Sequence, residues 1–337
     1  MSRLLCPPTM RLALIAALAT AAAGGIAIAS AMSDDSPERP AGAAAERTCK
    51  RPYSSRSPWN TPIGRRPAYH PQSDYHVAAL DGELTSDPTQ YTYPVYEVTG
   101  RTRRQPVRFT GVFSEVRRDR NLKILGEPTV RIPIPAAAEP AEGSDSQLII
   151  IDRNTGDEWG MWRLEKEGDG WKATNGSHYN VRWDGVPPRD RDGDGFTARG
   201  AGIPYLAGLV RRCEIDRGRI RHALAFAYDY PRPEHVYPAS KSDGESGDPR
   251  DLPEGARLQL DPALTPTDIR ELGCEGPCLT IARALQRYGM YVVDQGGRPK
   301  VMMEYEATAR WNGRVTAETV SPIPLSRFRL LQWPDAP

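Results

Sequence analysis

The segment RIRHALAFAYD, residues 219–229, is the clearest strand in the sequence and decides the fold class. Its side chains alternate in size along the chain. One face carries Ile220, His222, Leu224, Phe226 and Tyr228, and the other carries Ala223, Ala225 and Ala227. Because both faces are apolar, the segment is predicted to be a central strand of a layered sheet, covered on both sides.

The flanking sequence continues mostly as strands and turns. Strands are predicted at 146–152, 158–167 and 177–183, and a hairpin at 289–294 and 299–307 joined by QGGR. Short helices are predicted at 265–272, with Thr265 as the N-cap, at 277–289 and within 205–218. The 30 glycines and 32 prolines interrupt the chain too often for a helical bundle. We therefore expect a mostly β chain: a single-domain, two-layer β-sandwich of the jelly-roll kind with a few short packed helices, spanning residues 48–337.

The N-terminus has the features of an export signal. Two arginines precede the apolar run at 12–32, which ends in the small-residue pattern Ala-Ser-Ala at 29–31. This predicts a secretory signal peptide over 1–31, cleaved after Ala31, with no stable membrane insertion afterwards. The alternative is an uncleaved anchor, because a run of about 20 residues just spans a bilayer. Residues 32–47 are expected to form a disordered linker.

The cysteines support an oxidising compartment. Cleavage of the signal would remove Cys6 and leave four, at positions 49, 213, 274 and 278. An even count in an exported protein favours disulfides, with Cys274–Cys278 and Cys49–Cys213 as the expected pairs. Zinc is the alternative for the C-x-x-x-C pair, although no second pair or His-x-x-x-His follows it.

Charge and motifs exclude several classes of protein. The formal net charge is +1, which argues against a nucleic-acid partner. There is no G-x-S-x-G, H-E-x-x-H or P-loop, and no G-x-G-x-x-G after a strand.

Six motifs follow one another in a specific order: SPWNTPI (57–63), LIIIDRNTGDEWGMWRL (148–164), GAGIPYLAGLVRRCEIDRGRIRHALAFAY (200–228), VYPASKSDG (236–244), LPEGARLQLDP (252–262) and IARALQRYGMYVVDQGG (281–297). In them the chain resembles a broad family of secreted, largely uncharacterised β-rich proteins of the actinobacterial type. The resemblance covers roughly residues 57–330. It implies export and a single domain, and it assigns no activity or catalytic residue.

The stretch DRDGDGFTARGAG, residues 190–202, contains the first half of a calcium-loop signature. Asp190, Asp192 and Asp194 place carboxylates at alternating positions, a glycine permits the turn, and the carbonyl of Phe196 supplies a further ligand. The closing glutamate of an EF-hand is replaced by Ala201. We expect a structural Ca²⁺ here, and the alternative is an acidic turn without an ion.

Acidic and aromatic side chains gather on the predicted hairpin at 146–167. Glu158 and Trp162 share one face of its second strand, and Trp159 lies on the other. Sandwich-fold glycosidases carry paired carboxylates on a sheet face, beside aromatic rings that stack on sugars. Glu158 is thus a candidate catalytic residue, and Trp159 and Trp162 are candidates for sugar binding. The alternative places the tryptophans in the core.

Other polar residues are candidates for the same chemistry. His222 is a candidate base, because polysaccharide lyases use His or Tyr in that role; the alternative is a buried histidine held by hydrogen bonds. Lys241 and Asp243 lie in a loop after a strand end, where loops carry function, although a surface salt-bridged turn also explains them. His178 and Tyr237 are candidates for substrate contact.

Together these features predict a secreted carbohydrate-active protein that acts on extracellular polysaccharide, as a glycoside hydrolase or a polysaccharide lyase. Its expected catalytic residues are Glu158, His222, Lys241 and Asp243. The alternative is a non-catalytic carbohydrate-binding or envelope-associated structural protein on the same fold, because fold class does not decide function.

Overall fold

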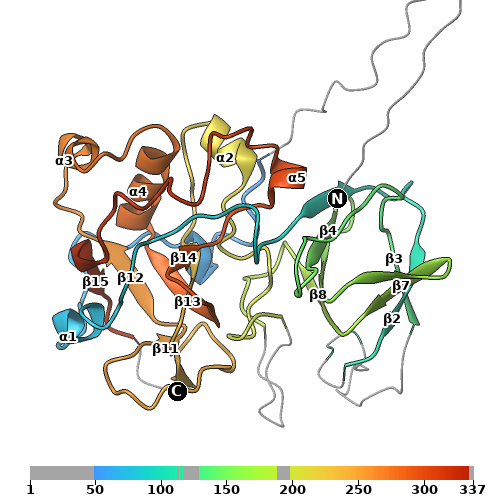
Figure 1. Cartoon of the computed structure of the whole chain (residues 1–337), viewed down its shortest axis with the longest axis horizontal. Coiled ribbons are helices and arrows are strands. Elements are labelled where there is room, and N and C mark those ends of the chain that lie inside the picture. Colours follow the sequence, from blue (N-terminus) through green and yellow to red (C-terminus); the bar gives the residue numbers. More distant parts are fainter. Residues whose placement is uncertain (1–48, 112–113, 115, 117–128, 188–197, 334–337) are drawn as a thin grey trace, which may run out of the picture. The chain divides into compact units, whose positions relative to one another are not determined.

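Strand β9, Leu224–Tyr228, lies inside a five-stranded sheet with the order β14-β9-β13-β12-β15 (Figure 1). The computed structural model describes residues 49–111, 114, 116, 129–187 and 198–333. The partners of β9 in this sheet are β12 (Arg257–Leu260), β13 (Met290–Gln295), β14 (Lys300–Val301) and β15 (Phe328–Leu330). Every residue of β9 is buried, as its two apolar faces predict.

The two faces of β9 belong to different cores. Leu224, Phe226 and Tyr228 join a first core that includes residues of α3 (Pro266–Glu271) and α4 (Pro277–Arg287). Ala223, Ala225 and Ala227 join a second core on the opposite side. The large side chains therefore face the helices, and the small ones let other chain segments approach the sheet closely.

Two four-stranded sheets pack against each other as a sandwich. One has the order β1-β4-β5-β8 and the other β3-β2-β7-β6. The first contains β1 (Val95–Val98), β4 (Leu148–Asp152), β5 (Asp157–Trp162) and β8 (Asn175–Asn180). The second contains β2 (Gln105–Phe109), β3 (Thr129–Ile132), β6 (Glu165–Glu167) and β7 (Gly170–Ala173). Leu148 and Ile150 of β4 share a third core with Val107 and Phe109 of β2.

Strand β4 connects the layers. Its other face, with Ile149 and Ile151, belongs to the second core together with the alanines of β9. All five residues of β4 are buried. The expected mostly β fold with layered sheets and a few short helices is confirmed, and the β9 sheet adds a further layer to the sandwich.

The remaining elements are short. They are the parallel pair β10 (Arg232–His235) and β11 (Pro253–Glu254), the helices α1 (Ser73–Val77), α2 (Arg212–Asp216) and α5 (Glu306–Ala309), and 3₁₀ turns at Pro58–Asn60 and Leu325–Arg327. In the ranges that the structure describes, no helix is long and apolar enough to cross a bilayer.

The predicted hairpin of 289–294 with 299–307 is wrong. β13 and β14 do not pair with each other, because β9 lies between them, parallel to β13 and antiparallel to β14. A strand that is apolar on both faces is most stable in the interior of a sheet, and β9 takes that position. The predicted cap of α3 is confirmed: Thr265 accepts a hydrogen bond from the backbone N–H of Asp268.

Both predicted disulfides are present, Cys49–Cys213 and Cys274–Cys278. The first ties the N-terminal segment to α2, and the second closes a short turn at the start of α4. The two bonds close loops of very different length, with sequence separations of 164 and 4 residues.

Loop length predicts an unequal contribution of the two disulfides to stability. A cross-link removes more entropy from the unfolded chain when its loop is longer, so replacing Cys49 and Cys213 by alanine should cost about 5 kcal/mol, against about 2 kcal/mol for Cys274 and Cys278. Urea unfolding of the two double variants beside the wild type measures this difference. An equal or reversed order would contradict the prediction.

Candidate functional site

Three carboxyl groups from separate parts of the chain meet in one place. One oxygen each of Asp243, Glu254 and Asp294 lies within 4.8 Å of the other two. Asp243 comes from the loop between β10 and β11, Glu254 ends β11, and Asp294 is near the end of β13. We call these residues the acidic triad.

Asp294 is placed by an irregularity in β13. The pairing of β13 with β9 shifts register between Val292 and Asp294. Such a bulge interrupts the alternation of side chains and redirects the residue that follows it. The Asp294 carboxylate then accepts a hydrogen bond from the backbone N–H of Gly200 at 3.0 Å.

Gly200 touches all three acids. A Cβ atom at this position would lie 2.2 Å from Oδ1 of Asp243 and 2.6 Å from Oε1 of Glu254. No side chain fits there, so glycine is required for the carboxyl groups to converge. The neighbouring Arg199 is buried, and its guanidinium donates hydrogen bonds to the Tyr93 hydroxyl and to the carbonyls of Tyr205 and Ala207.

Asp243 is the exposed member of the triad. Its loop is held by the Ser242 hydroxyl, which donates to the Arg232 carbonyl at 2.7 Å and accepts from the Gly244 N–H at 3.1 Å. Lys241 belongs to the same loop and is half-buried. The sequence therefore predicted two residues, Lys241 and Asp243, that the fold brings to a cluster of acids.

Glu254 is the buried member of the triad, with 0% of its surface exposed. Neither of its carboxyl oxygens accepts a hydrogen bond from a donor in the described part of the chain. Burial, followed by the negative charge of Asp243, raises the pKa of Glu254 to about 10. Glu254 is therefore neutral at pH 7, and it lies beside the Asp243 carboxyl without adding a second negative charge there.

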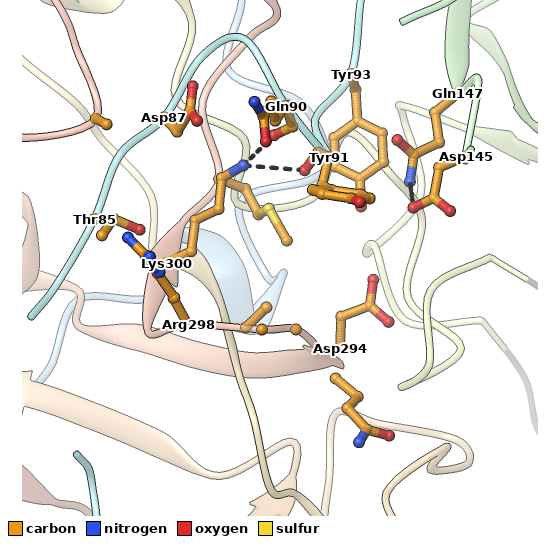
Figure 2. Close-up of a pocket in the computed structure, with 16 residues that line it drawn as sticks. Thr85, Asp87, Gln90, Tyr91, Tyr93, Asp145, Gln147, Asp294, Arg298 and Lys300 are labelled. Carbon is orange, nitrogen blue, oxygen red and sulfur yellow. Dashed lines mark hydrogen bonds between the residues drawn. The ribbon is translucent and has the colours of Figure 1, made fainter. Parts of the chain in front are cut away.

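Asp294 connects the triad to a pocket of about 700 Å³. The side chains of Tyr91, Tyr93, Asp145 and Gln147 line the same pocket, and Figure 2 shows the Asp294 carboxyl directed toward them. Burial, followed by the charge of Asp243, raises the pKa of Asp294 to about 7. Asp294 can therefore hold or release a proton near neutral pH.

One wall of this pocket is fixed by Lys300. Its ammonium donates hydrogen bonds to the backbone carbonyls of Gln90 and Tyr91 (Figure 2). Tyr91 has a positive φ of 46°, an uncommon conformation for a residue with a side chain. The contact with Lys300 holds this turn, and with it the exposed Tyr91 ring, at the rim of the pocket.

The arrangement permits two kinds of chemistry. Two accessible carboxyl groups beside a buried neutral acid suit proton transfer and nucleophilic attack. Three carboxylate oxygens within 4.8 Å could also hold a Ca²⁺ ion, which binds oxygens at about 2.3–2.6 Å but needs six to eight of them. In the described residues the triad is the only group of acids, histidines or cysteines with this spacing.

Glu158, a predicted catalytic residue, is buried in β5 between two donors. It accepts hydrogen bonds from the Tyr53 hydroxyl at 2.8 Å and from the Leu206 N–H at 3.0 Å. Burial raises the pKa of Glu158 to about 7, although both donors favour its charged form. The side chain thus joins the N-terminal segment and the 198–210 segment to the sheet, and its catalytic role stays a prediction.

His222 is likewise buried and has a partner on each ring nitrogen. Nε2 lies 3.0 Å from a Glu214 carboxylate oxygen, and Nδ1 lies 2.9 Å from the Ala223 carbonyl. Burial lowers the pKa of His222, but the Glu214 carboxylate outweighs it and the net direction is upward. His222 therefore links α2 to the start of β9, and its predicted role as a base has no support from these contacts.

The four predicted substrate-binding residues separate into two groups. Trp159, Trp162 and His178 lie on β5 and β8, away from the pocket that Asp294 borders. The rings of Trp159 and His178 are stacked at 5.2 Å, and His178 pairs with Asp157. Tyr237 is exposed and precedes Lys241 and Asp243 in the same loop. The predicted calcium ligands Asp190, Asp192, Asp194 and Phe196 lie outside the described residues.

Glu254 and Asp294 were not predicted as site residues. The available signal was the position of Asp294 at the carboxyl end of a buried strand that runs parallel to β9, an edge where sites often form. Comparison of the chain with protein-family models, curated proteins and solved structures found no match.

The neutral state of Glu254 predicts a pH-dependent effect of Glu254→Gln. The folded-state pKa of Glu254, about 10, is above its unfolded value of about 4.3, so the folded chain keeps a proton that the unfolded chain releases between these values. Wild-type stability therefore falls as pH rises through this window. Glutamine does not ionise. The free energy of unfolding of the variant should therefore rise relative to that of the wild type by up to about 1.4 kcal/mol for each pH unit across this window.

Urea unfolding at several pH values across this window measures the gain. Glu245→Gln is the matched control, because Glu245 is an exposed acid in the neighbouring loop. A stability difference between Glu254→Gln and wild type that stays constant with pH would show that Glu254 is ionised in the folded protein.

Proposed function

We propose that this protein is a secreted carbohydrate-active enzyme, a glycoside hydrolase that cleaves polysaccharide at the acidic triad. One observation carries the proposal. Two accessible carboxyl groups, Asp243 and Asp294, lie close together beside Glu254, which is buried and accepts no hydrogen bond from the described residues. Glycoside hydrolases commonly use such a pair of carboxyl groups, one as an acid and one as a nucleophile or base.

The distances favour a retaining mechanism. Retaining enzymes hold their two carboxyl groups about 5–5.5 Å apart, whereas inverting enzymes leave about 6.5–9.5 Å for a water molecule. The nearest oxygens of Asp243 and Asp294 lie within 4.8 Å. In this mechanism Asp243 attacks the anomeric carbon while protonated Asp294 gives its proton to the leaving oxygen. Water then attacks the glycosyl–Asp243 ester, giving a proton to Asp294 and releasing the Asp243 carboxylate.

Glu254 acts as a positioning residue in this scheme. It is fully buried, so it does not touch the substrate. Its neutral carboxyl group lies beside Asp243 in the triad, so it packs against that carboxylate without repelling it. The Lys241 charge opposes the rise in the pKa of both Glu254 and Asp294. Lys241 therefore favours the charged forms of Glu254 and Asp294, against the effect of burial.

A carbohydrate substrate is supported by the side chains around Asp294. The exposed Tyr91 supplies a ring face, and Asp145 and Gln147 supply hydrogen-bonding groups, a combination typical of ligand pockets. Export to an oxidising compartment is supported by the predicted signal peptide and by the two disulfides. Under this proposal the partner is an extracellular glycan.

Substitution at the triad tests the proposal directly. Asp243→Asn and Asp294→Asn should each lower kcat/KM by about a thousandfold, because each removes a group that takes part in bond cleavage. The activity of the wild type should fall as pH rises above about 7, where Asp294 loses the proton that it must donate. A panel of polysaccharides followed for new reducing ends measures both effects.

Glu245→Gln should retain wild-type activity in this assay and serves as the control. Full activity of Asp243→Asn or Asp294→Asn would end the assignment. Products that carry an unsaturated uronate would identify a lyase, and binding without product would favour the non-catalytic alternative.

We also propose, from the sequence of residues 190–196, that the protein binds a structural calcium ion there. Bound ligand at about 100 times its Kd adds about 2.7 kcal/mol to stability, so a chelator should lower the thermal midpoint. Asp192→Asn should remove this response, and Asp294→Asn should keep it. The opposite pattern would place the ion in the acidic triad, and an unchanged wild-type midpoint would exclude calcium at both.

A further inference from the structure

A second groove lies beside the loop that carries Asp243. It has a volume of about 890 Å³, and its wall includes Arg56, Arg182, Trp183, Asp184, Tyr237 and Ser240. None of these residues lines the pocket at Asp294. The groove therefore offers a separate surface to a ligand.

Two exposed aromatic rings line this groove. Trp183 is 56% exposed and Tyr237 is 48% exposed. Large aromatic side chains that are exposed in a concave surface, with charged residues beside them, are typical of ligand-binding sites. Arg56, Arg182 and Asp184 supply the polar groups that a sugar ring needs at its edges, while its faces lie on the rings.

The Trp183 side of the groove is held rigidly. The backbone of Trp183 donates to the Asn180 carbonyl at 3.0 Å and accepts from the Ser54 N–H at 2.7 Å. Its ring lies edge-on to Tyr179 at 5.0 Å, and the Tyr179 hydroxyl donates to Asp184 at 2.9 Å. A ring fixed in this way loses little conformational entropy when a ligand stacks on it.

One loop contributes residues both to the groove and to the acidic triad. Tyr237 and Ser240 line the groove, and Lys241 and Asp243 follow them directly in the chain. The Ser240 N–H donates to the Ala201 carbonyl at 2.9 Å, and Ala201 is next to Gly200, which touches all three acids. The groove wall and Asp243 are therefore held in the same part of the fold by this loop and by the segment at Gly200.

We infer that Trp183 and Tyr237 form a sugar-binding platform for residues of a polysaccharide distant from the cleaved bond. The inference rests on the proposed function, because it takes the triad as the place of cleavage. A substrate that occupies both the Asp294 pocket and this platform extends beyond the triad. The enzyme is therefore endo-acting and prefers long chains to short oligosaccharides.

Binding measured without cleavage tests the platform. The background is the full chain with Asp294→Asn, and the probes are xylan, soluble starch, carboxymethyl cellulose and polygalacturonate in affinity electrophoresis. At least one probe should retard this protein, and adding Trp183→Ala or Tyr237→Ala should weaken the apparent affinity for it by about tenfold. Trp183→Phe and Tyr237→Phe keep a ring and should restore most of the binding.

Tyr230→Ala is the matched control, because Tyr230 is as exposed as the platform residues but lies outside the groove. No retardation by any probe, or equal retardation with and without the two rings, would overturn the platform. In the otherwise wild-type chain, loss of the platform should raise KM for the polysaccharide and leave the hydrolysis of a short aryl glycoside unchanged.

The two proposals fail separately in these measurements. If Asp294→Asn binds a probe through Trp183 and Tyr237 but the wild type releases no reducing ends from it, the hydrolase proposal fails and the platform stands. If the wild type cleaves polysaccharide and the ring variants bind and cleave it as well as the wild type does, the platform fails and the hydrolase proposal stands.

Discussion

The contrast between the two faces of β9 is the constraint on which the rest of the structure depends. Its large side chains join the core that also contains residues of α3 and α4, so the helices must lie on that side. Its alanines leave room for a chain segment to lie directly on the opposite face. Gly208 uses that room: it accepts a hydrogen bond from the Ala225 N–H at 2.9 Å, and a Cβ on Gly208 would come within 2.4 Å of that nitrogen.

The position of the acidic triad follows from this close approach. The segment that reaches β9 at Gly208 begins with Arg199 and Gly200, and the buried Arg199 guanidinium fixes its course through the carbonyls of Tyr205 and Ala207. Gly200 is thereby placed under the three carboxyl groups. The Arg199 charge also lowers the pKa of Asp294, against the larger opposite effect of burial. The segment at Arg199 and Gly200 thus has two effects on the site. Gly200 leaves room for the carboxyl groups, and Arg199 contributes a positive charge near Asp294.

Local patterns predicted the parts of this fold that depend on neighbouring residues. Alternation predicted the burial of β9 on both faces, the Thr265 cap predicted α3, and the count of cysteines predicted both disulfides. The position of β9 between β13 and β14 depends on contacts between distant segments. The sequence alone therefore predicted a direct β13–β14 hairpin, which does not form. Glu254 and Asp294 were missed for the same reason. Their convergence requires the bulge in β13, the parallel pairing of β10 with β11, and a glycine from a third segment.

Buried acids in this protein differ in whether the fold supplies them with donors. Glu158 receives hydrogen bonds from Tyr53 and Leu206, which stabilise its charge and explain its burial as a structural contact. Glu254 receives none from the described residues, and an unsatisfied buried polar group costs about 1–3 kcal/mol. Alternation in a sequence cannot distinguish these cases, because both residues occupy inward positions on strands. A fold that keeps a buried acid without donors beside two further carboxyl groups gives up stability there, and burial together with the Asp243 charge keeps that acid in its neutral form.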